Sequence, residues 1–454
     1  MENEVKDLIE KSKVALQEYI HCSQEEVDKF CYAISKAVYD NAELLAQEAV
    51  DETQMGVFEH KIIKNKGASS SIWHQMKDKP SVGIIERNEK ENYFKVASPK
   101  GVIGCVTPTT NPSLSCIGNS LAALKGRNTV VISPHPRATK VSKHTVDIMN
   151  EALEKVGAPK NLIQIISEPS ADKTVELMAN VDVVVATGGA GIVRAAYSSG
   201  TPAYGVGQGN VQILVAEDYT DFNKVAENVV VSRYWDAGVQ CVGDQAVIAP
   251  KQKIPELVKA FEKADAFYIN DKATVNQFRD LLFENGTFSR HIVGKTALQI
   301  AEILHIDVPT TTKIFLLDLQ DMPHGDKELL CGEKMCPVTV LLSYDNFEEG
   351  LQLAVDNLKY QGAGHSSVIY TNNKETIEKV GLTIPAGRIL INQPGTSATG
   401  ATLTNAIRST SSIGCGSWGN NSISHNLVFE DLLDIAIVAG TFDTPAPTDE
   451  EIYQ

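Results

Sequence analysis

The sequence predicts an α/β protein with two doubly wound domains, and three observations support that class. With 454 residues, the chain exceeds the size at which a single hydrophobic core stops growing. Short apolar, β-branched runs alternate with helical segments between residues 102 and 216, as expected for parallel strands covered by helices. The same alternation resumes after Cys241, so we expect a second α/β unit and an active site between the two.

The first unit begins with a helix. Ser23 and Glu26 have capping-box spacing and apolar residues follow at helical period, which predicts one long amphipathic helix over residues 23–50. Five apolar runs then predict parallel strands, separated by helical segments such as 139–156 and 171–179. The predicted strands are VIGCV (102–106), TVVIS (129–133), LIQII (162–166), VDVVVA (181–186) and VQILVA (211–216).

The second unit follows Cys241 with the same kind of pattern. The expected elements are a helix at 252–264, strands at 314–319 and 338–344, a helix at 346–360 and strands near 367 and 389. Residues 397–424 are rich in Gly, Ser, Thr and Asn, which predicts a long ordered loop. The apolar run LLDIAIVAG (432–440) predicts a strand that lies outside both cores and is available to pair with another subunit.

Composition excludes several classes of partner. The formal charge is −16 and the Lys and Arg residues are scattered, which argues against nucleic acid. No apolar run approaches the roughly 20 residues that cross a bilayer, and the N-terminus is too polar for a secretory signal, so we expect no membrane contact and a cytoplasmic protein. The eight cysteines show no CxxC pair, and Cys331, Cys336 and His324 leave a zinc site one ligand short, so we expect neither a disulfide framework nor a metal.

Two segments could bind a phosphorylated ligand. Gly188, Gly189 and Gly191 lie between a predicted strand and a predicted helix, where backbone N–H groups can face a phosphate, although a tight turn without a ligand would use the same glycines. His135, Arg137 and Lys140 follow the strand at 129–133 with no acid beside them in the sequence. An Arg at this place can accept the 2′-phosphate of NADP, and a solvated basic loop is the alternative.

Two further residues suggest covalent chemistry. Asn111 lies before a proline, so its amide is held rigidly and could stabilise an oxyanion, although a structural turn would also use Asn. Cys241 follows a turn of small residues and could be a buried filler, a disulfide partner, a metal ligand or a nucleophile. When a thiolate adds to an aldehyde, the adduct can release hydride to a nicotinamide and leave a thioester on the enzyme. This reaction needs a nucleophile, an oxyanion donor and a dinucleotide site, and these segments offer a candidate for each.

These motifs resemble the aldehyde dehydrogenase superfamily, in particular its coenzyme A-acylating branch. The resemblance covers essentially the whole chain, and within the branch it is strongest to CoA-dependent succinate-semialdehyde dehydrogenases. The motifs that carry it are VDETQMGVFEHK, ATGGAGIVRAAYSSGTPAYGVGQGN, EKMCPV, GAGHSS and GCGSWGNNSIS.

The resemblance implies a fold and a set of site residues. It implies a cofactor-binding domain at 1–226 with a return segment near 412–426, a catalytic domain at 227–411 and a small β oligomerisation arm at 427–454. Cys241 would be the nucleophile, Asn111 the oxyanion amide and His365 a residue near the thiol or the transfer step. The implied cofactor-binding residues are Thr107, Pro108, His135, Arg137, Gly188, Gly189, Gly191, Gly207 and Glu333, the last on the nicotinamide ribose.

The sequence lacks an acid at a position that bears on which molecule accepts the acyl group. Hydrolytic members resemble one another in a glutamate that activates water, whereas the corresponding stretch GVGQGN (205–210) contains no acid. Without a general base water is a poor acceptor, and coenzyme A is the thiol that the acylating branch uses. A hydrolytic enzyme with another base, such as Asp244, and a scaffold protein without activity are the alternatives.

The aldehyde is predicted from a few positions. The sequence departs from its look-alikes around Cys241, at His425 and at Arg408. A guanidinium can bind a carboxylate or sulfonate, so Arg408 and Gln240 are the predicted substrate-binding residues, with an Arg408 ion pair at the surface as the alternative. We expect succinate semialdehyde first, then sulfoacetaldehyde, ahead of acetaldehyde and propionaldehyde. The cofactors are then NADP or NAD, with coenzyme A as co-substrate, in a homodimer or homotetramer.

Overall fold

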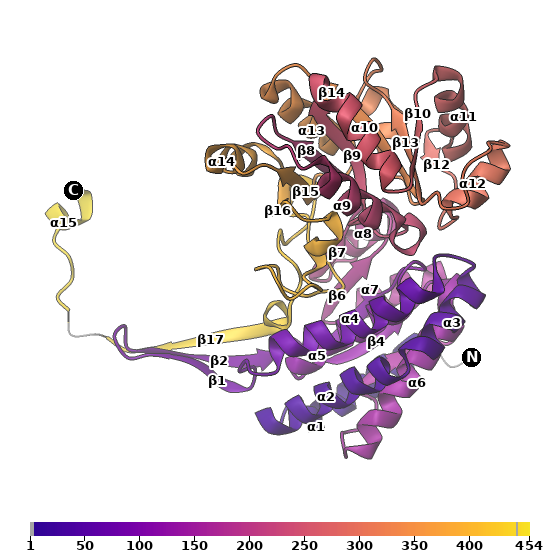
Figure 1. Ribbon diagram of the computed structural model, residues 1–454. Helices are drawn as coiled ribbons and strands as arrows, with labels where there is room; N and C mark the ends of the chain where they lie inside the picture. Colours follow the sequence, from indigo (N-terminus) through magenta and orange to yellow (C-terminus); the bar gives the residue numbers. More distant parts are fainter. Residues whose placement is uncertain (1–3, 442–443) are drawn as a thin grey trace.

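Two parallel β-sheets, each with helices on both faces, form the body of the computed structural model, and a narrow antiparallel arm projects from it (Figure 1). The structure describes residues 4–441 and 444–454. The predicted class of two doubly wound units with a β arm is therefore confirmed.

The first sheet has five parallel strands in the order β5-β4-β3-β6-β7. They are β3 (Val102–Val106), β4 (Thr129–Ser133), β5 (Ile163–Ile165), β6 (Val183–Thr187) and β7 (Ala203–Val206). Alternate residues of each strand enter different cores: Ile103 packs with α2, α4, α5 and α6, whereas Val102 packs with α1 and α7. Burial on both faces explains why these strands are continuous apolar runs.

The helices of this unit are α1 (Glu4–Tyr19), α2 (Gln24–Asp40), α3 (Ala42–Thr53), α4 (Phe58–Met76), α5 (Pro112–Lys125), α6 (Thr139–Lys155), α7 (Ala171–Asn180) and α8 (Ala190–Ser198). The capping box of Ser23 and Glu26 is present, but the single helix predicted over 23–50 is wrong. It breaks at Asn41, whose side-chain amide donates to the carbonyl of Ala37 and competes with the helical pattern.

The second sheet has seven parallel strands in the order β10-β13-β14-β9-β8-β15-β16. They are β8 (Val211–Val215), β9 (Asp244–Pro250), β10 (Ala266–Ile269), β13 (Ile314–Asp318), β14 (Val338–Tyr344), β15 (Gly364–Tyr370) and β16 (Ala386–Ile391). The place predicted for the run 211–216, in the first unit, is wrong, because β8 pairs with β9 and β15. The chain thus crosses between the sheets at residues 207–210, and the boundary predicted at 226 comes too late.

The helices of this unit are α9 (Phe222–Tyr234), α10 (Ile254–Lys263), α11 (Lys272–Leu282), α12 (Ala297–Leu304), α13 (Phe347–Tyr360) and α14 (Lys374–Thr383), with a short hairpin of β11 (Phe283–Glu284) and β12 (Thr287–Phe288). The helices predicted at 252–264 and 346–360 and the strands predicted at 314–319 and 338–344 are confirmed.

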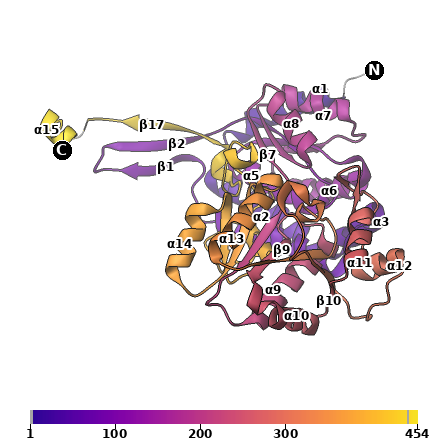
Figure 2. The same ribbon diagram turned by 90° about the horizontal axis from the view of Figure 1, so that it is seen from above.

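The arm consists of β1 (Gly83–Asn88), β2 (Tyr93–Pro99) and β17 (Leu433–Ala439), and α15 (Asp449–Tyr453) follows it. Figure 2 shows the arm extending away from both sheets. The strand predicted at 432–440 is confirmed, and its partner within the chain is β2, a pairing that the local sequence pattern does not predict. β17 forms one edge of this sheet and exposes Ile435, Ile437 and Val438. Residues 442–443 of the predicted arm lie outside the described residues.

The predicted loop over 397–424 is also confirmed, with short 3₁₀ turns as its only regular structure. It returns to the first unit, where the hydroxyl groups of Ser411 and Ser412 donate to Asn119 of α5. No helix in the described part of the chain is long and apolar enough to span a membrane.

Candidate active site

Cys241 lies on a strained turn between α9 and β9. A 3₁₀ turn at Trp235–Gly238 follows α9, and within it Asp236, Ala237 and Gly238 have φ values of 50°, 52° and 73°. Two successive non-glycine residues in this region are uncommon and mark a place where the backbone serves a site. Cys241 is half-buried and is a free thiol, as are the other seven cysteines.

Arg233 joins the Cys241 turn to the segment that carries Glu333. Its fully buried guanidinium donates to the carbonyls of Gly238 (2.5 Å) and Gly243 (3.4 Å), on both sides of Cys241. It also donates to the carbonyls of Lys334 and Cys336. The backbone positions of the two segments are therefore fixed relative to each other.

Arg388 on β16 joins two further segments through hydrogen bonds to their carbonyls, as Arg233 does. Its buried guanidinium donates to the carbonyls of His365 (2.5 Å), Gly414 (2.7 Å) and Ser424 (3.1 Å). It thus ties the start of β15 to the long loop that returns to the first unit, and its charge acts on Cys241.

The thiol of Cys241 is protonated at rest. Burial, followed by the negative charges of Glu333 and Cys415, raises its pKa to about 12, and Arg388 opposes this. A thiolate is the reactive form, so it must be generated when substrate and cofactor are present. Among the described residues, no group of three or more His, Cys, Asp or Glu side chains could hold a metal ion.

Glu333 lies against the crossing segment beside Cys241. Its carboxylate accepts from the backbone N–H of Gly209 (3.3 Å), and burial raises its pKa to about 7. A Cβ at Gly209 would lie 1.8 Å from the carbonyl oxygen of Cys241, so only glycine allows this approach. Glu333, Gly209 and Cys241 therefore lie in contact in that order.

Asn111 is the residue before α5. Its side-chain N–H donates to the Thr110 hydroxyl (3.3 Å), and its carbonyl oxygen is buried without a partner. It lines a small cavity together with Lys61 and Lys64 of α4. Lys64 in turn interacts electrostatically with Cys241, which links the predicted oxyanion amide to the predicted nucleophile.

His365 is fully buried at the start of β15. Its Nδ1 bonds to the Ser366 hydroxyl (3.0 Å) and its Nε2 has no partner. Burial and then the charge of Arg388 lower its pKa to about 3, so the ring is neutral near pH 7. As placed here, His365 can orient a ligand by a hydrogen bond but is a weak base.

The carboxyl edge of the first sheet fits a dinucleotide. The hydroxyl groups of Thr107 after β3 and Thr187 of β6 are buried without partners. A Cβ at Gly189, Gly191 or Gly207 would meet no atom within 4 Å, so open space lies over these glycines. A Cβ at Gly188, beside them, would meet the side chain of Ile192, and Pro108 is half-buried at the same edge. Unpaired polar groups beside an open glycine turn are the features that a pyrophosphate needs.

A cavity of about 510 Å³ lies next to this edge. Residues of α8, Gly207, Gln208, the end of α13 and Cys415–Asn420 line it, and Arg194 and Lys359 supply positive charge. Its volume lies in the range typical of cofactor sites.

At the end of β4, two charged residues from distant parts of the chain join those predicted from the local sequence. Partial burial and the charges of Arg137 and Arg290 lower the pKa of His135, so a second Arg from the other unit joins the predicted pair. The absence of an acid, expected from the sequence, is wrong: Glu52 of α3 accepts from the backbone N–H groups of Lys140 (2.9 Å) and Val141 (2.8 Å). Glu52 and Arg290 were missed because each is distant in sequence.

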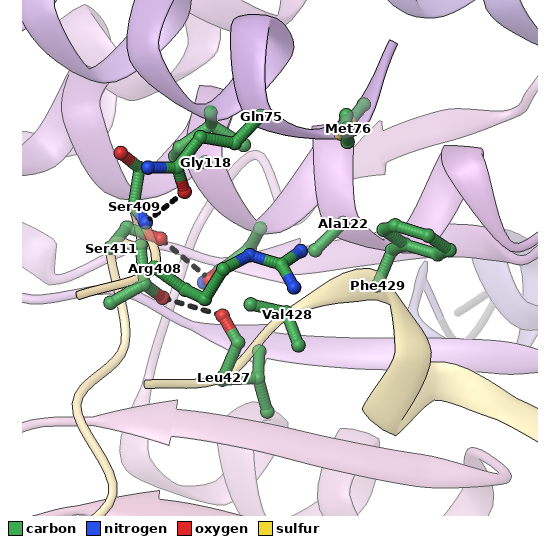
Figure 3. Close-up of a pocket in the computed structure, with 13 residues that line it drawn as sticks. Gln75, Met76, Gly118, Ala122, Arg408, Ser409, Ser411, Leu427, Val428 and Phe429 are labelled. Carbon is green, nitrogen blue, oxygen red and sulfur yellow. Dashed lines mark hydrogen bonds between the residues drawn. The ribbon is translucent and has the colours of Figure 1, made fainter. Parts of the chain in front are cut away.

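Arg408 lies outside this arrangement. Its guanidinium donates to Glu430 (3.2 Å) and lines a pocket between α4, α5 and residues 427–429 (Figure 3). No contact of its side chain reaches Cys241, Asn111 or His365, so the ion-pair interpretation is favoured over substrate binding. Gln240, next to Cys241 and half-buried, stays a predicted substrate contact.

Asp244, the alternative base, is part of the protein core. It is fully buried, and its carboxyl accepts from the backbone N–H of Gly395 (3.1 Å). Burial raises its pKa to about 8. A protonated acid that contacts the Gly395 loop anchors that loop and is poorly placed to activate water.

Comparison with known proteins gives consistent results. A model of the aldehyde dehydrogenase family matches residues 1–275. The chain is 47% identical to succinate-semialdehyde dehydrogenase (acetylating) of Clostridium kluyveri, with 100% of both chains covered. It is 38% identical to sulfoacetaldehyde dehydrogenase of an Acholeplasma species, covering 98% of this chain and 92% of that protein.

Solved structures are also similar over nearly the whole chain. An acetylating aldehyde dehydrogenase from Geobacillus thermoglucosidasius has a TM-score of 0.93 at 34% identity and 98% coverage of both chains. Propionaldehyde dehydrogenase of Rhodopseudomonas palustris, with bound CoA and an acylated cysteine, has a TM-score of 0.86 at 28% identity, covering 96% of this chain and 97% of that chain.

The raised pKa of Asp244 predicts a pH-dependent stability. Folding raises this pKa from roughly 4 to about 8, so its contribution is fully present below about pH 4 and is lost as the pH rises through 8. Asp244→Asn should therefore gain stability relative to the parent between about pH 5 and pH 8, by up to roughly 1.4 kcal/mol per pH unit. Denaturant midpoints at both pH values measure this, with exposed Asp345→Asn as the control. A difference between Asp244→Asn and the parent that is the same at both pH values would show that Asp244 is ionised in the folded protein.

Proposed function

The chain belongs to the aldehyde dehydrogenase family, and on that premise we propose that it is a CoA-acylating aldehyde dehydrogenase. It interconverts a short anionic aldehyde and its acyl-CoA, uses NADP or NAD, and passes through a thioester on Cys241. The observation that carries this proposal is the stretch beside Cys241: residues 205–210, the end of β7 and the crossing segment, hold glycines and no acid.

The residues of the site have distinct roles in this reaction. The Cys241 thiolate forms a bond to the aldehyde carbon, and the Asn111 amide donates to the oxygen that becomes negative. Thr107, Thr187 and the glycine turn 188–191 would hold the nicotinamide cofactor, which would supply the acceptor for the hydride of that carbon. Cys241 then holds the acyl group as a thioester until the CoA thiolate attacks it and the Cys241 thiolate departs.

The positions of the two acids near the Cys241 thiol indicate which molecule accepts the acyl group. Glu333 bonds to Gly209, in the place where the resemblance puts the ribose contact, and Asp244 is committed to the core. Neither is arranged to activate a water molecule, so a thiol is the better acceptor. The cavity with Arg194 and Lys359 has the size and charge for part of the polyanionic coenzyme.

Succinate semialdehyde is the proposed aldehyde, since the relative of that name is 47% identical over the full length. Sulfoacetaldehyde, named in a relative at 38% identity, is the alternative. We also retain the predicted cytoplasmic location and homodimeric or homotetrameric assembly. The free edge and exposed apolar residues of β17 provide a surface for pairing with another copy.

Cys241→Ala should abolish turnover and leave the fold intact, because the covalent intermediate cannot form. The expected loss of kcat exceeds roughly 10²-fold, as losses of a nucleophile do. Circular dichroism and NAD(P)H formation together measure this. Cys22→Ala, at another half-buried thiol, is the matched control and should keep its activity. Turnover retained in Cys241→Ala would contradict the proposal.

CoA should be required for sustained oxidation of the aldehyde. Without it the enzyme should stop after about one equivalent of NAD(P)H, because water reacts slowly with a thioester that lacks a general base. The reverse reaction, acyl-CoA reduction by NAD(P)H, should proceed readily. Free acid released without CoA at a comparable rate would instead indicate a hydrolytic enzyme.

The end of β4 predicts the preference between NADP and NAD. Glu52 occupies the backbone N–H groups of α6 and adds negative charge where a 2′-phosphate would lie beside Arg137. Glu52→Gln should lower the KM for NADPH severalfold with little effect on NADH, and Arg137→Ala should raise the KM for NADPH more than that for NADH. Steady-state kinetics with both cofactors test this. Equal effects on the two cofactors would place the 2′-phosphate elsewhere.

A further inference from the structure

A buried ion cluster connects α4 to the turn before Cys241. The carboxylate of Asp236 accepts from the ammonium groups of Lys61 (3.0 Å) and Lys64 (2.5 Å), and from the backbone N–H of Val57 (2.8 Å). The side chains of Lys61, Lys64 and Asp236 are 4%, 5% and 0% exposed. Lys61 is the last residue of the motif VDETQMGVFEHK and Lys64 follows it, and the proposed reaction gives neither lysine a role.

The cluster holds a strained backbone. Asp236 and Ala237 adopt left-handed conformations that L-residues with a Cβ avoid, and they lie shortly before Cys241. His60 adds a further contact, because its Nδ1 accepts from the backbone N–H of Asp236 (2.9 Å) and its ring stacks on Trp235 at 4.5 Å. Contacts from α4 thus fix the entry to the Cys241 turn.

The cluster also carries excess charge. Two lysines share one carboxylate, so one positive charge is left over in a site with almost no solvent. Burial lowers the pKa of Lys64 to about 8, whereas Asp236 and Cys241 raise it. Lys61 and Lys64 also line the cavity of about 10 Å³, room for roughly one water, that contains Asn111. The charge therefore lies beside the predicted oxyanion amide and on the contacts that reach the turn before Cys241.

We propose that Lys64, anchored by Asp236 and Lys61, is a positioning residue that holds the turn before Cys241 and stabilises the Cys241 thiolate by its charge. The proposal rests on the proposed function, in which Cys241 is the nucleophile. The other groups that act on Cys241 are Glu333 and Cys415, which oppose the thiolate, and Arg388, which favours it. The groups that act on Lys64 are Asp236, Lys61 and Cys241.

Alkylation of the full-length enzyme by iodoacetamide tests the charge directly, since only the thiolate reacts. The rate at Cys241 is followed by mass spectrometry of its peptide from roughly pH 6 to 10. Lys64→Gln should slow alkylation at about pH 8 on the order of tenfold and move the profile to higher pH, because a nearby buried charge is lost. Lys64→Arg should restore the rate to within roughly threefold of the parent.

Asp236→Asn distinguishes an effect of charge on Cys241 from a loss of structure in the turn. It also tests the proposal if the Lys64→Gln variant does not fold. Asn tolerates the left-handed conformation, and its substitution removes negative charge from the cluster. Because Asp236 raises the pKa of Lys64, the comparison is made at about pH 6, where Lys64 keeps its proton. A charge effect there predicts alkylation at least as fast as in the parent, opposite to Lys64→Gln. An unchanged profile in Lys64→Gln would overturn the proposal. Slower alkylation in both variants would overturn the stabilisation of the thiolate by charge, because loss of the contact with the turn would then explain both.

Lys125→Gln is the matched control, because Lys125 is a fully buried lysine paired with Asp28 in the first unit. It should lower the melting temperature without changing the alkylation profile of Cys241. If the alkylation profile of Cys241 shifted as much in Lys125→Gln as in Lys64→Gln, the effect would be due to a general loss of stability. Failure of the proposed function would be seen separately, as turnover in Cys241→Ala, whatever the alkylation profiles show.

Discussion

The geometry of the site depends on two buried guanidinium groups that bind the carbonyls of irregular segments. Segments without regular structure must find partners for their backbone polar groups, and each buried carbonyl left unpaired costs about 1–3 kcal/mol. Arg233 satisfies carbonyls on both sides of Cys241 and beside Glu333, and Arg388 does so around His365 and the return loop. Removing either side chain would therefore release several segments at once.

These two arginines explain why residues far apart in the sequence meet at one place. The chain crosses between the sheets at residues 207–210 and comes back through the loop after β16. The first crossing contacts Cys241 at Gly209, and Cys415 of the second acts on the pKa of Cys241. Close backbone contacts complete the arrangement: a Cβ at Gly209 would overlap Cys241, and a Cβ at Gly364 would overlap the carbonyl of Cys415. The packing leaves Cys241 half-buried beside Glu333 and Arg388.

Local patterns predicted much of the fold, and long-range contacts account for what they missed. The capping box at Ser23, the strands of the first sheet and the β17 strand were recognisable because each depends on neighbouring residues. The sheet to which β8 belongs depends on pairing with β15, about 150 residues away, and the run 211–216 itself carries no sign of it. For the same reason the ion pair of Arg408 with Glu430 and the placement of Glu52 at α6 could not be predicted from the sequence.

Burial of the thiol has two opposite consequences for acyl transfer. Exclusion of water protects a thioester on Cys241 and favours a thiol acceptor, but the same desolvation raises the pKa of Cys241 to about 12 and disfavours the thiolate. Positive charge that is itself buried can offset this without admitting water. Arg388 stays charged, since burial lowers its pKa only to about 10, and its hydrogen-bond partners are carbonyls, a serine hydroxyl and an Asn side chain, with no carboxylate among them. A site that excludes water and still supports a thiolate therefore requires cations that no carboxylate neutralises. Arg388 meets this requirement because its partners are neutral, and the pair of Lys61 and Lys64 meets it because the two share one carboxylate.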